Sequence, residues 1–404
     1  MAVGEAVFPQ MPVIEGIRLG TAQAGIKKPG RRDLVVIELP EGSSVSGVFT
    51  RNAFCAAPVH VARRHLRQAG TRYLVINTGN ANAGTGERGM RDAEATCQAL
   101  ATLTGCAAEA VLPFSTGVIG EPLPMARLEA GLPDALAGLD DGAEAWQRAG
   151  EGILTTDTRA KGATATCTIG GRTVTINGIS KGSGMIQPNM ATMLAFVATD
   201  AAIEPTLLDS LLRESVDRSF NCITVDSDTS TNDACLLMAT GRSAQVAEAS
   251  DIADFREALD RVMLALAQAI IRDGEGATKF VTLAVSEARS RREALDVAFT
   301  VAHSPLVKTA LYASDANWGR ILAAVGRAPV EDFDVSAVTI DLGDVRLVEG
   351  GGRAEDYTEA SGSREMAREE ITIRIALGRG DAAATVWTTD LSHDYVSINA
   401  DYRS

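Results

Sequence analysis

Short strand-like segments alternate with longer helix-like segments along this chain, and this alternation limits the possible folds more than any other feature. Residues 34–39 and 73–77 are short apolar runs rich in branched side chains, which is typical of buried strands. Residues 58–68 begin with a proline and have the spacing of an amphipathic helix. The sequence therefore predicts an α/β fold in which mixed sheets are layered with helices.

Glycines mark the expected turns between these segments. Gly170 and Gly171 separate two alternating runs and predict a hairpin with a two-residue turn. Residues 349–364 combine consecutive glycines with many charges, and we expect an exposed loop there. The remaining expected strands are 44–49, 110–114, 163–169, 173–176, 192–198, 280–285, 338–342, 371–375 and 384–388. The remaining expected helices are 90–104, 122–139, 143–153, 251–272 and those that follow Pro205, Arg291 and Trp318.

The size and charge of the chain limit what it can bind. With 404 residues it is long enough for two domains. It carries 38 Lys and Arg against 52 Asp and Glu, and its net charge of −14 argues against nucleic acid and an anionic membrane surface as partners. Its apolar runs are far shorter than the roughly 20 residues of a membrane span, and residues 1–10 lack the pattern of a signal peptide. We expect a cytoplasmic protein with no nucleic-acid or membrane partner.

Cysteine and histidine usage limits the chemistry that the chain can carry out. The six cysteines are scattered and form no Cys-x-x-Cys pair, and there are only four histidines. Buried, reduced thiols are therefore expected rather than a zinc site or a disulfide framework. We expect no metal and no other cofactor, and few candidates exist for a histidine-assisted nucleophile.

Two segments resemble ligand-binding loops but lack essential residues. Residues 84–89 (GTGERG) fit a dinucleotide-binding string, yet residues 78–83 separate them from the preceding strand, and a glycine-rich surface loop is expected. Residues 226–230 resemble the start of a calcium loop. Thr231 and Leu237 stand where such a loop needs glycine and glutamate, so a turn is expected.

The segment at 181–193 (KGSGMIQPNMATM) is more informative. Its composition predicts a flexible, glycine-rich loop that carries Lys181 and leads into a buried strand. It also has the features of a self-cleaving threonine. If the bond between Ala191 and Thr192 breaks, Thr192 gains a free α-amine with a pKa of about 7.7–8.0. That amine can accept the proton of the threonine hydroxyl without any histidine.

This segment is similar to the cleavage segment of the ornithine acetyltransferase (bifunctional glutamate N-acetyltransferase) family of arginine biosynthesis. The resemblance continues in chain order over nearly the whole sequence, at residues 48–59, 75–89, 115–120, 155–158, 220–233, 272–280, 317–327 and 395–404. It implies an N-terminal-nucleophile-like fold. It also implies self-cleavage into an α chain (1–191) and a β chain (192–404) that stay associated, as α2β2.

The resemblance also implies roles for individual residues. Thr192 is the expected nucleophile and new N-terminus, and Ala191 supplies the cleaved carbonyl. Thr116 and Gly117 are the expected oxyanion-hole pair, in a loop after a strand. On their own, Lys181 and Glu275 would be expected at the surface; together they suit the carboxylate and the side-chain ammonium of an acylated diamino acid. The expected substrate-binding residues are Thr155, Lys181, Thr192, Glu275, Asn399 and Ser404.

The implied reaction is acetyl transfer from N2-acetylornithine to glutamate through acetyl-Thr192, giving ornithine and N-acetylglutamate, with acetyl-CoA as an alternative donor. Two other functions stay open at this point. An aminopeptidase or amidase with an N-terminal nucleophile and a related fold would pass the acyl group to water. A non-catalytic nucleotide-binding protein would use the loop at 84–89.

Overall fold

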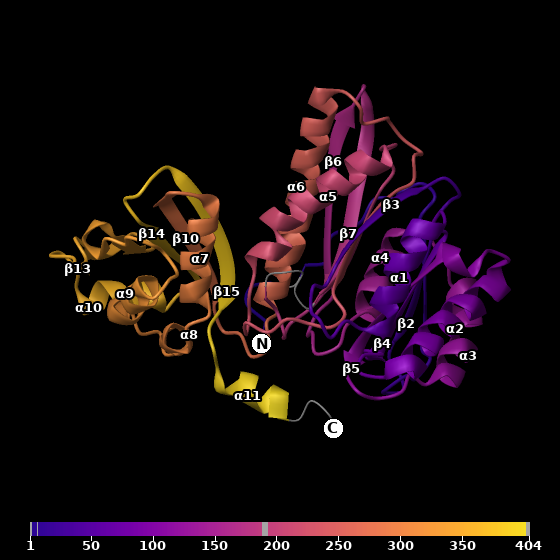
Figure 1. Ribbon diagram of the computed structural model, residues 1–404, viewed down its shortest axis with the longest axis horizontal. Helices are drawn as coiled ribbons and strands as arrows, with labels where there is room; N and C mark the ends of the chain where they lie inside the picture. Colours follow the sequence, from indigo (N-terminus) through magenta and orange to yellow (C-terminus); the bar gives the residue numbers. More distant parts are fainter. Residues whose placement is uncertain (1, 6, 188–192, 401–404) are drawn as a thin grey trace.

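The computed structural model describes residues 2–5, 7–187 and 193–400, and these form two lobes that lie side by side (Figure 1). The larger lobe extends to the end of helix α6 (Ala249–Arg272), and the smaller lobe begins with strand β10 (Phe280–Ala288). Helix α11 (His393–Ala400) leaves the smaller lobe and runs toward the larger one. The predicted α/β fold with layered sheets is confirmed.

Two stacked sheets form the centre of the larger lobe. One has the order β1 (Arg18–Ala22), β2 (Leu34–Glu38), β4 (Tyr73–Asn80), β5 (Val111–Val118). The other has the order β3 (Ser44–Phe49), β9 (Ala234–Ala239), β8 (Leu194–Thr199), β7 (Arg172–Lys181), β6 (Lys161–Ile169). Between the sheets, Phe114 and Phe196 pack edge to face with ring centroids 5.2 Å apart. This apolar layer fixes how the ends of β5 and β8 face each other.

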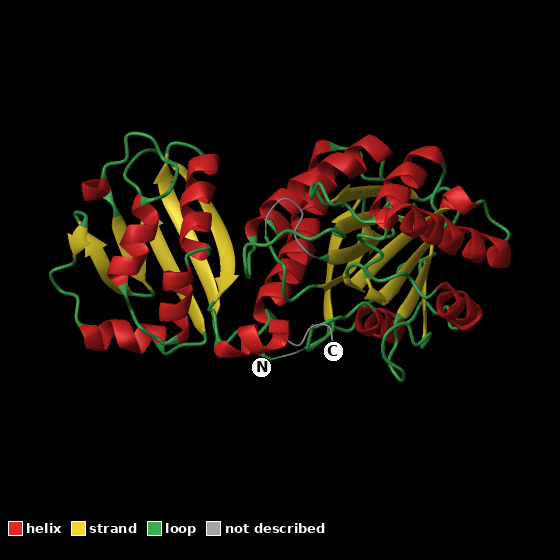
Figure 2. Cartoon of the chain, turned by 60° about the horizontal axis from the view of Figure 1, so that its bottom comes forward, coloured by secondary structure: helices red, strands yellow, loops and turns green. Residues whose placement is uncertain are grey.

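Helices cover the outer faces of both sheets (Figure 2). Helices α2 and α3 pack on the first sheet, whereas α5 and α6 pack on the second. Helix α1 contacts β5 and β3, and α4 contacts β1. The bounds are α1 (Ala57–Gln68), α2 (Gly86–Thr104), α3 (Met125–Ala137), α4 (Ala143–Gly152) and α5 (Pro205–Arg218), with 3₁₀ turns at Ala108–Ala110 and Phe220–Cys222.

The smaller lobe is one mixed sheet with helices packed on it. Most of its apolar side chains form a core of their own, whereas Phe280 of β10 and Trp387 of β15 pack against the core of the larger lobe. The strand order is β13 (Gly352–Arg353), β12 (Val345–Glu349), β11 (Thr339–Leu342), β14 (Glu370–Ala376), β10, β15 (Ala382–Thr389). The helices are α7 (Arg291–Ala302), α8 (Pro305–Tyr312), α9 (Trp318–Gly326) and α10 (Glu359–Met366), with a 3₁₀ turn at Val335–Ala337.

Some sequence-based expectations about local structure were wrong. Residues 349–364 are mostly exposed, as expected, but they are not a loop throughout, because β13 pairs with β12 and helix α10 begins at a capping box between Thr358 and Ser361. Tyr357 is buried beside this helix start. Capping and burial therefore outweigh the glycines and charges that favoured a loop. Helix α8 was not expected, and helix α2 begins at Gly86 rather than near residue 90.

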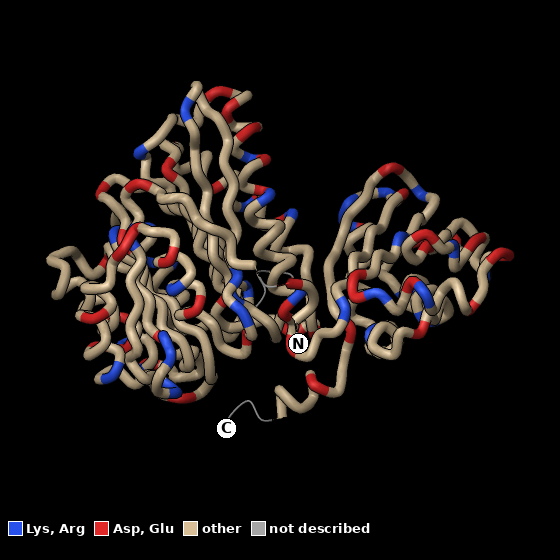
Figure 3. The backbone as a smooth tube through the Cα atoms, turned by 180° about the vertical axis from the view of Figure 1, so that it is seen from behind, with Lys and Arg blue, Asp and Glu red and all other residues tan. Residues whose placement is uncertain are grey.

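Acidic and basic residues are distributed along the backbone of both lobes (Figure 3). None of the helices in the described ranges combines the length and the apolarity that spanning a membrane requires. The expected cytoplasmic location stays a prediction.

Candidate active site

A pocket lies where the ends of β5 and β7 meet the segment before β9, the α6–β10 connection and helix α11. It brings together all six predicted site residues that fall within the described ranges. Ala191, Thr192 and Ser404 lie outside those ranges. The residues that line the pocket are Ala81, Thr116, Gly117, Ile119, Thr155, Thr156, Lys181, Gly184, Met185, Ser230, Thr231, Asn232, Glu275 and Asn399.

Thr116 and Gly117 are part of strand β5, not of a loop after it as expected. Strand β5 is parallel to β4, and Gly117 aligns with Gly79 where the pairing is irregular. Gly117 has φ +136, and a Cβ on it would lie 2.2 Å from the carbonyl carbon of Gly79. Only glycine fits here, and its backbone departs from regular strand geometry at the pocket wall.

Lys181 is the last residue of β7 and is 4% exposed, so it is not the surface charge that the residue alone would suggest. Its ammonium Nζ donates to Thr116 Oγ1 at 3.3 Å and lies 4.0 Å from Asp157 Oδ2. Burial lowers the pKa of Lys181, and the nearby Asp157 carboxylate opposes that shift. This contact leaves the Thr116 hydroxyl proton free to point elsewhere, because the ammonium can only donate.

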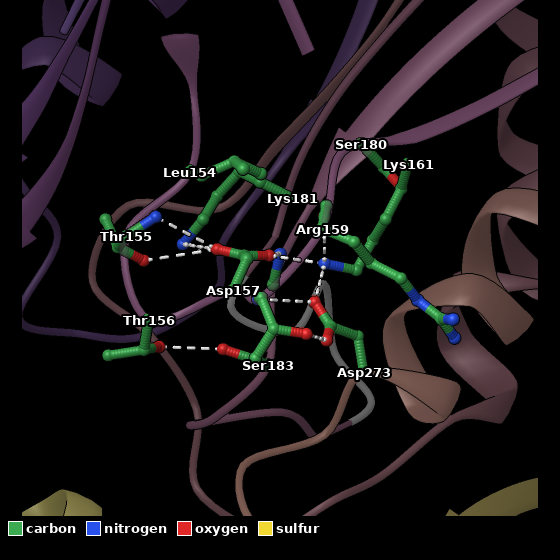
Figure 4. A network of polar contacts seen from close by, with 12 residues as sticks. Leu154, Thr155, Thr156, Asp157, Arg159, Lys161, Ser180, Lys181, Ser183 and Asp273 are labelled. Carbon is green, nitrogen blue, oxygen red and sulfur yellow. Dashed lines mark hydrogen bonds and ion pairs between the residues drawn. The ribbon is translucent and has the colours of Figure 1, made fainter. Parts of the chain in front are cut away.

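A buried ionic network supports Lys181 (Figure 4). The ammonium of Lys161 lies 2.6 Å from a carboxylate oxygen of Asp157 and 2.6 Å from one of Asp273. Asp157 also accepts hydrogen bonds from the backbone N–H of Gly182 (2.7 Å) and of Thr155 (3.0 Å). Burial alone would raise the pKa of Asp157, but the charges of Lys161 and Lys181 hold it well below its ordinary value. The network therefore stays ionised and keeps two backbone segments in place.

Glu275 is also buried, at 9% exposure, and is not the surface charge that the residue alone would suggest. Its carboxylate oxygen Oε2 accepts a hydrogen bond from Asn399 Nδ2 at 2.8 Å, which ties helix α11 to the pocket. Its backbone N–H donates to the carbonyl of Ser183 at 2.8 Å. A Cβ on Gly184 would lie 2.3 Å from the same Oε2, so glycine is required for the carboxylate to approach this closely. Glu275 therefore places a carboxyl group in the wall of the pocket that Thr116 also lines.

Two neighbouring residues before β9 were not assigned roles from the sequence. Asn232 donates through Nδ2 to the carbonyls of Ala81 (2.7 Å) and Ser115 (2.9 Å), so it ties β9 to the end of β5. Asp233 is buried, and its Oδ1 accepts the backbone N–H of Met193 at 3.1 Å. Burial raises the pKa of Asp233 well above its ordinary value. Both lie in the segment 220–233 that carried part of the resemblance, but no pattern in that segment shows which side chains turn inward.

Comparison with known proteins establishes the family. The model of the ArgJ family matches residues 18–404. The chain belongs to the ArgJ family. It is 56% identical over 408 aligned residues to a Pseudomonas fluorescens (strain Pf0-1) protein, with 100% of both chains covered. It is 59% identical over 394 residues to a Methylococcus capsulatus (strain Bath) protein, covering 97% of this chain and 96% of that one. Both relatives are named arginine biosynthesis bifunctional protein ArgJ.

Two solved structures are similar to parts of this ArgJ-family chain. The ArgJ protein of Bacillus halodurans is 36% identical with a TM-score of 0.48, covering 50% of this chain and 95% of that one. An ornithine acetyltransferase from Mycobacterium tuberculosis, complexed with ornithine, is 32% identical with a TM-score of 0.39, covering 43% and 92%. The family membership inferred from the sequence motifs is confirmed by the family model and the full-length relatives.

The glycine string at 84–89 has a structural explanation in this ArgJ-family fold. Strand β4 continues to Asn80, three residues beyond its expected end, and helix α2 starts inside the string. A Cβ on Gly89 would lie 1.9 Å from the Thr85 hydroxyl, and Thr85 in turn donates to Asn82. The space beside Gly89 at the start of α2 is therefore filled by the side chains of Thr85 and Asn82.

The segment at 226–230, which resembles the start of a calcium loop, is hydrogen-bonded to the pocket residue Met185. The carboxylate of Asp226 accepts the backbone N–H groups of Met185 (2.6 Å) and Ile186 (2.9 Å), as well as the N–H of Asp228.

Within the described residues, no group of His, Cys, Asp and Glu side chains is placed to hold a metal ion. The six cysteines are free thiols; Cys55, Cys106 and Cys167 are partly exposed, contrary to the expectation of burial.

Proposed function

We propose that this chain is an acetyltransferase of arginine biosynthesis that moves the acetyl group of N2-acetylornithine to glutamate. The observation that carries the proposal is the convergence of Thr116, Lys181, Glu275 and Asn399 on one pocket in an ArgJ-family chain. The pocket offers a hydroxyl for developing negative charge, an ammonium beside it and a carboxylate for a cationic side chain.

In the first half-reaction, the Thr192 α-amine accepts the proton of its own hydroxyl while the oxygen attacks the acetyl carbonyl. The negative oxygen of the tetrahedral intermediate accepts hydrogen bonds from the Thr116 hydroxyl and the Gly117 N–H. Lys181 donates to Thr116 Oγ1, which orients the hydroxyl proton away from the ammonium. The C–N bond then breaks, the α-ammonium returns its proton to the leaving nitrogen, and ornithine departs.

In the second half-reaction, the α-amine of glutamate attacks the acetyl ester of Thr192. The same oxyanion contacts form again, and the Thr192 α-amine accepts a proton from the attacking nitrogen and passes it to the threonine oxygen, which leaves as the hydroxyl while N-acetylglutamate is released. Acetyl-CoA is proposed as a second donor that enters before this step, in keeping with relatives that are named bifunctional.

Cleavage at Ala191–Thr192 gives an α chain (1–191) and a β chain (192–404). Strand β7 of the α chain pairs with β8 of the β chain from Ile176–Thr199 to Lys181–Leu194, and β3 pairs with β9. The two chains would therefore share one sheet, and the sheet supports their lasting association. An α2β2 assembly is proposed from the family resemblance.

The proposed reaction is tested by looking for the acetyl-enzyme. Incubation with N2-acetylornithine alone should place one acetyl group on the first residue of the β chain, detected by mass spectrometry. Two-substrate kinetics should give parallel lines, and activity should fall below about pH 7–8, where the α-amine is protonated. Rapid release of acetate without acetylglutamate would favour the aminopeptidase or amidase alternative. Intersecting lines without an acetyl-enzyme would mean direct transfer in a ternary complex.

Glu275→Gln tests the contact to the ornithine side chain. The amide keeps the size of the side chain and its hydrogen bond with Asn399 but removes the charge. We expect KM for N2-acetylornithine to rise about tenfold, the value of one charge-assisted hydrogen bond, and KM for glutamate to stay the same or fall. Glu257→Gln, on an exposed part of α6, is the matched control. An equal rise of both KM values would contradict the assignment.

A further inference from the structure

The two amino-acid substrates of the proposed function pose a charge problem. The ornithine side chain is a cation and suits Glu275, whereas the glutamate side chain is an anion and is repelled by it. Among the described residues that line the catalytic pocket, Lys181 is the one Lys or Arg, and it already contacts Asp157 and Thr116. A second carboxylate therefore needs a cation from outside this pocket.

A second pocket directly beside the first contains such cations. Lys27, Lys28 and Arg31 line it, in a chain whose net charge is −14. Gly117, Thr155 and Thr156 line both pockets, so the basic pocket adjoins the oxyanion-hole pair. We call it the basic pocket.

The segment that carries these cations is anchored at several points. Both oxygens of the buried Asp33 accept backbone hydrogen bonds, from Ala24 N at 2.7 Å and from Ile26 N at 2.6 Å. The guanidinium of Arg31 donates to the carbonyl of Leu154 at 2.6 Å, next to the pocket residue Thr155. These bonds hold the segment that carries the cations in the wall of the basic pocket, and both oxygens of the Asp33 carboxyl group are occupied by hydrogen bonds within that segment.

A glycine permits the close approach of this segment to the strand end. Gly79 has φ +100, and a Cβ on it would lie 2.7 Å from the Cβ of Lys27. Gly79 is also the register partner of Gly117. Gly117 and Gly79 therefore shape the pocket wall beside Thr116, and Gly79 lets the segment that carries Lys27 approach this wall closely.

We propose that the basic pocket binds the side-chain carboxylate of the acceptor glutamate, while Glu275 binds the side-chain ammonium of the donor. This inference rests on the proposed function and explains how one active site accepts two amino acids whose side chains have opposite charges. The donor side chain and the acceptor side chain then point toward different walls of the site, and each wall repels the wrong one.

The test separates the two half-reactions of the cleaved enzyme. Lys28→Ala and Lys28→Glu change an exposed side chain of the basic pocket, so folding is not at risk. We expect KM for glutamate to rise about tenfold in the alanine variant and further in the glutamate variant. Formation of the acetyl-enzyme from N2-acetylornithine should stay within about twofold of wild type, and Lys28→Arg should restore the glutamate KM.

Arg242→Ala is the matched control, because it removes an exposed positive charge beyond the far end of β9. An unchanged glutamate KM in both Lys28 variants would overturn the proposal, and so would an equal rise of the donor and acceptor KM values. A rise in KM for acetyl-CoA with glutamate unchanged would also overturn it, since the pocket would then hold phosphate. If the wild-type enzyme formed no N-acetylglutamate, the proposed function and this subsite would fail together.

Discussion

Replacing Thr192 with alanine is expected to abolish self-cleavage and activity together. The hydroxyl of Thr192 is the proposed nucleophile both for the Ala191 carbonyl and for the acetyl group of the substrate. Without it no ester can form at either step. A denaturing gel and an intact-mass measurement should show one full-length chain, whereas the wild type should give two fragments, the second starting at Thr192.

Met193 and strand β8, which follow the proposed cleavage site, are firmly held in the larger lobe. Met193 is 1% exposed, its N–H is held by Asp233, and its carbonyl accepts the N–H of Ala234 at 3.1 Å. Strand β8 then starts at Leu194, parallel to β9 and antiparallel to β7. Met193, which follows the proposed cleavage site, is therefore held by burial and by two hydrogen bonds to the start of β9 and the residue before it.

Two further variants make the result decisive. Thr192→Ser keeps a hydroxyl and should still cleave, though at a different rate. Thr206→Ala removes an exposed threonine at the start of α5 and should cleave like the wild type. A Thr192→Ala protein that still appears as two fragments would refute threonine-dependent cleavage.

Thr116→Ala should lower kcat by about two to three orders of magnitude with little change in KM. The hydroxyl is proposed to donate to charge that exists only in the transition state, and loss of one such donor has an effect of this size. Lys181 still has Asp157 as a partner in this variant, so the network beneath the site remains intact. The measurement is steady-state kinetics on cleaved protein, together with the melting temperature as a check on folding.

Thr116→Ser is the control, because it keeps the hydroxyl and loses only a methyl group. It should retain most of the activity. If Thr116→Ala instead raised KM and left kcat unchanged, the hydroxyl would be a contact to the ground-state substrate, and Thr116 would not belong to the oxyanion hole.

The local patterns of the sequence predicted much of the fold. The strands predicted at 34–39 and 44–49 correspond to β2 and β3, and Pro58 lies in the first turn of α1. The glycine pair at 170–171 joins β6 to β7 in a hairpin. These predictions succeeded because strand periodicity, proline at a helix start and glycine at a tight turn act over a few neighbouring residues. The loop expected at 349–364 is exposed over most of its length, but β13 and the start of α10 interrupt it, because β13 pairs with β12 and α10 has its own capping box.

The sequence by itself determined the kinds of elements, the family and the identity of the candidate site residues, since each of these is written in short motifs. Only the tertiary structure decided that Lys181 and Glu275 are buried, that Asp157, Lys161 and Asp273 form one network, and that Lys28 lies in a pocket beside Gly117. Lys161 and Asp273 are 112 positions apart. The physical reason is that burial and charge pairing depend on which elements pack together, and packing joins distant segments through shape and desolvation rather than through any local pattern.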